Sequence, residues 1–143
     1  MQQDQQAVRA RDEELLAAAR EAMTMAYAPY SRYRVGACLL AEDGRVFKGC
    51  NVECASFGMT ICAERAALVQ AVTAGARRFV AIAVAAEGAA PYPCGACRQM
   101  LNEFAPRLRV LVTWDGQVSA TTLDALLPHS FGPDSLPAQE ENA

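Results

Sequence analysis

The sequence is organised around two short stretches, TICAER at residues 60–65 and PCGACRQ at residues 93–99. The two cysteines of the second stretch have the C-x-x-C spacing with which one helical turn offers two thiolates to one metal ion. Cys62 can supply a third thiolate if its helix begins beside theirs, so the candidate ligands are Cys62, Cys94 and Cys97. Three protein ligands leave one tetrahedral position open, which is typical of catalytic rather than structural zinc.

Glu64 follows Cys62 by two residues and is not needed as a ligand. A ligand-x-Glu segment followed by Pro-Cys-x-x-Cys is the signature of zinc-dependent deaminases, and this sequence has the three-cysteine form. On these motifs the chain resembles the small, homotetrameric cytidine deaminases from about Glu14 to Leu136. The resemblance implies one Zn2+ per subunit and hydrolysis of cytidine and 2′-deoxycytidine to uridine, 2′-deoxyuridine and ammonia, in pyrimidine salvage. Glu64 would be the general acid and base.

The same resemblance implies the residues that bind the nucleoside. Asn51 and Glu53 match an Asn-hydrophobic-Glu segment that holds the ribose 3′-hydroxyl, a task that suits an amide and a carboxylate. Tyr33 stands where the family usually has Phe near the ribose, and its hydroxyl needs a partner if buried. Ala63 is expected at the substrate, and Phe131 corresponds to an aromatic residue that reaches a neighbouring subunit's site and stacks on the base. A contact in a satellite core is the other interpretation of Phe131. Ala55 and Phe57 are further candidates for the border of the site.

Arg65 and Arg98 each follow one of the cysteine motifs. Three thiolates around one Zn2+ leave excess negative charge, so both arginines are candidates to donate hydrogen bonds to the sulfurs. The resemblance supports this role for Arg65, whereas a solvated surface position is the alternative for both. The remaining cysteines are expected to be packing thiols, with Cys38 inside a strand. These are Cys38, Cys50 and Cys54.

Hydrophobic periodicity and turn signals predict helices over residues 12–26, 62–73 and 94–104, and a short one from Thr121 or Thr122 to Leu127. Strands are predicted over residues 35–40, 45–51, 79–86, 108–114 and 117–120, and the apolar run 79–86 reads as a central strand parallel to its neighbours. This order gives an α/β fold with a mixed five-stranded sheet covered on both faces, in agreement with the three-layer αβα sandwich that the resemblance implies. The ligands would then lie on helix N-termini at the carboxyl ends of strands.

The whole chain of 143 residues fits a single domain over residues 12–136, between flexible segments at 1–11 and 137–143. The net charge is -3 and no basic stripe occurs, which disfavours nucleic acid as a partner. No apolar run is long enough to span a membrane and no signal peptide is present, so a cytoplasmic location is expected. Without a sign of secretion, metal binding suits the six cysteines better than a disulfide framework.

Three rival interpretations share part of this pattern. A nucleic-acid-editing deaminase typically has His in place of Cys62 and needs a basic surface. A blasticidin-S-type aminonucleoside deaminase shares the Cys-Ala-Glu and Pro-Cys-Gly-x-Cys-Arg elements and is the closest alternative. A structural zinc module would want a fourth protein ligand, and no further Cys or His is suitably placed in the sequence.

Overall fold

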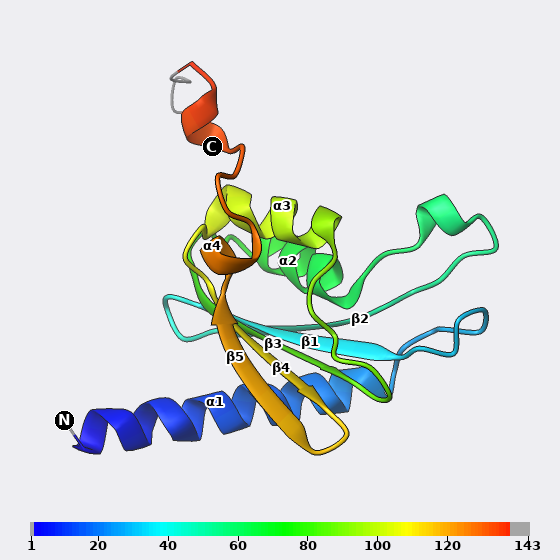
Figure 1. The fold of residues 1–143 in the computed structure, drawn as a ribbon, viewed down its shortest axis with the longest axis horizontal. Helices are drawn as coiled ribbons and strands as arrows, with labels where there is room; N and C mark the ends of the chain where they lie inside the picture. Colours follow the sequence, from blue (N-terminus) through cyan, green and yellow to red (C-terminus); the bar gives the residue numbers. More distant parts are fainter. Residues whose placement is uncertain (1, 138–143) are drawn as a thin grey trace.

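The computed structural model describes residues 2–137, which form one sheet with helices on both faces (Figure 1). None of the helices in these residues combines the length and apolar character needed to cross a bilayer. The strands are β1 (Val35–Ala41), β2 (Val46–Cys50), β3 (Phe79–Ala86), β4 (Arg109–Trp114) and β5 (Gln117–Thr122). The helices are α1 (Gln2–Met23), α2 (Ala63–Thr73), α3 (Gly95–Phe104) and α4 (Leu123–Leu126), with short 3-10 turns η1 (Phe57–Met59) and η2 (Pro133–Ser135).

The strand order is β2-β1-β3-β4-β5, which confirms the predicted mixed five-stranded sheet. β3 and β4 run parallel, and the other neighbours pair antiparallel. The prediction that the strand at 79–86 is parallel to its neighbours is therefore wrong on the β1 side. Residues 81–86 are all buried, because helices cover both faces of the strand. An apolar run indicates that both faces of a strand are buried, but it does not indicate whether the strand is parallel or antiparallel to its neighbours.

The first helix differs from its predicted bounds. α1 begins at Gln2 instead of Asp12, because residues 2–11 contain no glycine or proline that would interrupt a helix. Asp12 therefore lies inside α1, and its carboxylate accepts hydrogen bonds of 3.1 and 2.8 Å from the Arg109 guanidinium on β4. The helix ends at Met23, before the predicted Ala26. The predicted flexible tail at 137–143 lies outside the described residues except for its first residue.

Two apolar cores hold the three layers together, one on each side of the sheet. α1 packs on one face, while α2, α3 and α4 lie over the other (Figure 1). Cys38 is fully buried between β1 and α1, as expected for a small core residue. The core under α2 and α3 includes Leu39, Leu68, Ile82, Leu101 and Val110, and the core under α1 includes Leu15, Leu16, Ala19 and Leu111.

Gly49 lets α2 lie directly against β2. A Cβ added at this position would be 2.5 Å from the carbonyl oxygen of Ala63 and 2.5 Å from the nitrogen of Ala67. Both atoms belong to the backbone of α2, so the strand and the helix touch without side chains between them. This close approach fixes the first turn of α2 over the sheet.

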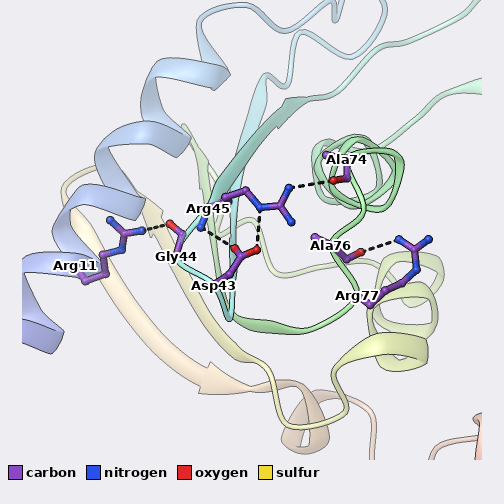
Figure 2. A network of polar contacts seen from close by, with 7 residues as sticks. All are labelled: Arg11, Asp43, Gly44, Arg45, Ala74, Ala76 and Arg77. Carbon is purple, nitrogen blue, oxygen red and sulfur yellow. Dashed lines mark hydrogen bonds and ion pairs between the residues drawn. The ribbon is translucent and has the colours of Figure 1, made fainter.

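The hairpin turn between β1 and β2 is tied to helices of both outer layers (Figure 2). Arg11 on α1 donates a 2.7 Å hydrogen bond to the carbonyl of Gly44, whose positive φ of 93° suits the predicted turn. Arg45 pairs with Asp43 at 2.9 Å and donates to the carbonyl of Ala74, just after the last turn of α2. The turn therefore anchors the C-terminal end of α2, and the N-terminal end of α2 lies at the other end of this helix, away from the turn.

We expect Gly49→Ala to lower the free energy of unfolding by at least about 1–3 kcal/mol, the usual cost of overpacking, because backbone atoms cannot move aside as a side chain can. Thermal unfolding followed by circular dichroism measures this change. Gly58→Ala is the matched control, since a Cβ there meets nothing within 4 Å. Equal stability of the two variants would show that the close approach is not required.

Candidate active site

Two helix starts bring the three motif cysteines together. Cys62 is the N-cap of α2 and Cys94 is the N-cap of α3, each in an extended conformation, and Cys97 lies one turn further along α3. The sequence predicts that these two helices begin at Cys62 and Cys94, whereas in the structure each helix begins one residue later. Neither N-cap thiol bonds to its own helix backbone, so both sulfurs are free to face each other.

A pair of backbone bridges sets the position of Cys62. After β2, Val52 exchanges two 3.0 Å hydrogen bonds with Ile61, in an antiparallel bridge that closes the intervening loop. Val52 also forms a parallel bridge with Tyr27 in the segment after α1. Cys62 follows this bridge directly, so the end of β2 and the start of α2 are held side by side.

The sulfur atoms have the spacing of a zinc site. The Sγ atoms of Cys62 and Cys94 are 3.8 Å apart, and those of Cys94 and Cys97 are 3.5 Å apart. Zn–S bonds of ~2.3 Å at tetrahedral angles place sulfurs ~3.8 Å apart, so the cluster fits one zinc ion. Among residues 2–137, no other His, Cys, Asp or Glu joins this group. The fourth position is therefore left to water or substrate.

The thiols differ in their readiness to lose a proton. The pKa of Cys62 is lowered to about 5, chiefly because Cys97 donates a hydrogen bond to it, with further contributions from Arg65 and Cys94. The pKa of Cys97 is raised, chiefly because its proton is held by the Cys62 thiolate. One ligand is thus ready to bind a cation, and metal binding must expel the proton of Cys97.

Arg65 lies against the cluster, whereas Arg98 does not. The Arg65 Nη2 donates to the Sγ of Cys62 over 3.5 Å, which offsets thiolate charge. The Arg98 Nε donates to the carbonyl of Pro93 over 2.6 Å, and its Nη1 donates to Leu126 over 2.9 Å. Of the two interpretations left open for Arg98, the structure shows neither a bond to a sulfur nor a solvated side chain, because its guanidinium ties the residue before Cys94 to the end of α4.

Glu64 sits in the first turn of α2 and is 4% exposed. Burial chiefly, with a contribution from the negative charge of Cys62, raises the pKa of its carboxyl to about 7. A cation in the cluster would favour the carboxylate and oppose this shift. A buried carboxyl beside a metal site, able to take and release a proton near neutral pH, suits acid and base chemistry.

A hollow of about 190 Å³ opens beside the cluster. Larger hollows occur elsewhere on the surface, so this hollow is identified as the candidate site by the thiols and the carboxyl in its lining and not by its size. Four of its lining residues were not singled out from the sequence, although they flank the motifs or the predicted ribose contacts: Val35, Thr60, Pro91 and Tyr92. The others were all candidates: Tyr33, Asn51, Cys62, Ala63, Glu64 and Cys94.

Asn51 and Glu53 take different positions relative to the hollow. The buried Asn51 amide accepts a 2.9 Å hydrogen bond from the nitrogen of Val35 and donates a 2.8 Å bond to the carbonyl of Tyr33. One N–H and one lone pair of this amide remain for a ligand. The Glu53 carboxylate is not part of the lining and accepts hydrogen bonds from the Ser31 nitrogen and hydroxyl and from the Tyr30 nitrogen.

The two aromatic candidates, Tyr33 and Phe131, also differ in their position relative to the hollow. The Tyr33 ring lines the hollow, and its hydroxyl donates a 2.8 Å hydrogen bond to the carbonyl of Ala89, which supplies the partner that a buried phenol needs. Burial raises the pKa of this phenol, and the charge of Glu64 adds to the effect. Phe131 is 60% exposed and outside the hollow, so a core contact is not its role within one chain. Ala55 and Phe57 are exposed and do not line the hollow.

Comparisons with known proteins agree with this geometry. Residues 9–113 match the family described as cytidine and deoxycytidylate deaminase zinc-binding region. A cytidine deaminase of Sporosarcina psychrophila is 45% identical over 87% of this chain and 93% of its own length. The chain belongs to the cytidine deaminase family.

The fold comparison points the same way. The crystal structure of a cytidine deaminase from Burkholderia pseudomallei superposes with a TM-score of 0.80 and 49% identity, covering 83% of this chain and 98% of that one. A blasticidin-S deaminase of Bacillus cereus is more distant, at 30% identity over 84% of this chain and 91% of its own length. The matched region is the family's zinc-binding region, and the thiol cluster supplies the ligands for one such ion.

We expect Cys62→Ala to lose zinc, because two thiolates cannot replace three. The loss of affinity should exceed the about 10- to 100-fold that follows removal of a group outside the ligand shell. Zinc per subunit, measured by mass spectrometry of the dialysed protein, checks this outcome. Cys50→Ser is the matched control, since Cys50 is a free thiol outside the cluster. A zinc-replete Cys62→Ala protein would refute the ligand assignment.

Proposed function

We propose that the chain hydrolyses cytidine and 2′-deoxycytidine to uridine, 2′-deoxyuridine and ammonia. The observation that carries the proposal is the buried carboxyl of Glu64 beside three converging thiols, at the edge of one hollow. A general acid and base next to an open metal position suits hydrolysis of an aromatic amine. A structural zinc site would have no use for this carboxyl.

The proposed roles at the reacting centre follow from these positions. Cys62, Cys94 and Cys97 would hold one Zn2+, which supplies Lewis-acid chemistry that lowers the pKa of water toward neutrality. Glu64 takes a proton from the attacking water and gives it to N3 of the pyrimidine. As the water oxygen bonds to C4, the same carboxylate takes the second proton from the new C4 hydroxyl and gives it to the amine, so that the C4–N bond breaks, the carbonyl forms and ammonia leaves. Arg65 offsets thiolate charge through Cys62.

The proposed nucleoside contacts start from side chains that are already fixed. Asn51 is held by the backbone at both ends of its amide and offers its spare donor and acceptor to the ribose 3′-hydroxyl. Glu53 has acceptor capacity left after its contacts with Tyr30 and Ser31, and shares that hydroxyl. Tyr33 and Ala63 line the hollow against the nucleoside.

We infer a homotetramer with active sites near the subunit interfaces. Large apolar side chains stand exposed, and Tyr30 and Phe57 stack edge-to-face at 5.7 Å on the surface. The segment with η1 and the C-terminal arm with η2 both extend away from the sheet (Figure 1). Phe131, exposed at the start of that arm, is proposed to reach the base in a neighbouring subunit. Such surfaces are typical of contacts between chains.

The cellular setting is also a proposal. We propose one deaminase domain over residues 12–136, acting in the cytoplasm in pyrimidine salvage. Three cysteines that must stay reduced to bind metal favour a reducing compartment. A free nucleoside fits the hollow without any basic surface, so neither nucleic acid nor membrane is required as a partner.

We expect Glu64→Gln to slow turnover by at least about 10²- to 10⁴-fold, the usual contribution of an acid–base group, because the amide cannot accept and return a proton. Loss of the cytidine absorbance band measures the rate. The variant should keep its zinc, which separates lost chemistry from lost metal. Blasticidin S serves as the rival substrate: a zinc-loaded wild type that converts it and not cytidine would overturn the proposed function.

We expect Phe57→Ser to weaken the tetramer, because an exposed apolar anchor at a subunit contact is removed. Light scattering coupled to size-exclusion chromatography gives the mass of the particle at several protein concentrations. Val118→Ser replaces another exposed apolar side chain, on the edge strand β5, and serves as the control. A wild-type protein that stays monomeric would contradict the proposed assembly.

A further inference from the structure

The loop at residues 87–93 forms one wall of the hollow without any regular secondary structure of its own. It connects β3 to α3, brings Pro91 and Tyr92 into the lining and ends at Cys94. Its shape must therefore be set by bonds from other elements, since it has no ladder or helix of its own.

Side chains from the β4–β5 hairpin hold one side of this loop. Asp115, in the turn, accepts a 3.0 Å hydrogen bond from the nitrogen of Gly88. The Tyr92 hydroxyl donates to the Ser119 hydroxyl on β5 over 3.1 Å. Both bonds link the loop to the far edge of the sheet, on the side away from β1.

On the β1 side, the loop is held by the hydroxyl of Tyr33. This hydroxyl donates a 2.8 Å hydrogen bond to the carbonyl of Ala89, two residues before Pro91. Tyr33 is itself fixed through its backbone, because its nitrogen donates to the Ser31 hydroxyl at 3.0 Å and its carbonyl accepts from Asn51 at 2.8 Å. The Tyr33 phenol therefore links the part of the lining that contains Asn51 to the part formed by the 87–93 loop.

We propose that Tyr33 is a positioning residue whose hydroxyl fixes the 87–93 loop against the Asn51 side of the hollow and so sets the spacing between its two walls. A phenylalanine would keep the ring in the lining and lose the link. The phenolic proton is committed to Ala89, so the hydroxyl acts on the loop and does not donate to the ligand. The part of this inference that concerns the nucleoside rests on the proposed function.

Hydrogen exchange of the loop amides tests the link without any activity. In Tyr33→Phe, the amide of Gly88, which its bond to Asp115 protects, should exchange about three- to tenfold faster, because the loop loses a neighbouring hydrogen bond, while the amides of β4 stay unchanged. Tyr27→Phe removes a more exposed phenol and is the matched control. Wild-type exchange in the Tyr33→Phe loop would overturn the proposal, whatever the enzyme's substrate.

Kinetics then test the consequence for binding. In Tyr33→Phe, KM should rise about three- to tenfold with kcat nearly unchanged, since a loose wall weakens ground-state and transition-state binding alike. The same factor is expected with cytidine, 2′-deoxycytidine and 5′-deoxycytidine. An effect that disappears with one of these analogues would show a direct contact with the missing hydroxyl and overturn the positioning role.

Two further outcomes complete the test. Asp115→Ala loosens the neighbouring residue of the same loop, so its effect on KM should combine with that of Tyr33→Phe non-additively. A lower melting temperature with unchanged KM and unchanged loop exchange would indicate a merely structural phenol and overturn the proposal. A wild type inactive on all three nucleosides would refute the proposed function, whereas the exchange experiment would still decide the role of Tyr33.

Discussion

Three thiols converge because two helices, α2 and α3, begin at the same place above the sheet. Each N-terminus carries positive partial charge, so the start of a helix is a favourable place for a thiolate. Cys62 and Cys94 occupy the N-cap positions, and the C-x-x-C spacing returns Cys97 to the same point. The hollow, the buried carboxyl of Glu64 and the amide of Asn51 all lie beside this meeting point.

Packing on the sheet holds the two helix starts in place. Gly49 allows the first turns of α2 to rest on β2, and the bridge between Val52 and Ile61 ties the preceding loop to the end of that strand. Arg98 secures the residue before Cys94 to the end of α4. A site that must present three sulfurs within a few ångströms is thus supported from several elements, which suits the precision that metal ligation requires.

Charge is balanced within a small volume. Burial favours the neutral form of Glu64, whereas Arg65 and the hydrogen bonds from neighbouring thiols favour the anionic form of Cys62. A bound cation would stabilise the Glu64 carboxylate and the Cys62 thiolate, and would therefore lower the pKa of both groups. Around this centre, the polar groups of Asn51 and Tyr33 are already engaged with backbone atoms, so the walls of the hollow are organised before a ligand enters.

The candidate metal ligands, the acid–base candidate and the element order could be predicted from the sequence, because ligand spacing, helix breakers and hydrophobic runs are local properties. The sequence could not reveal the partners of Asp12 and Arg98, because Arg109 and Leu126 are remote in the chain and leave no local signal. The direction of β3 relative to β1, the wall formed by Pro91 and Tyr92, and the bond between Tyr33 and Ala89 were decided only by the tertiary structure. Each depends on which segments the folded sheet brings side by side, and a one-dimensional pattern does not contain that information.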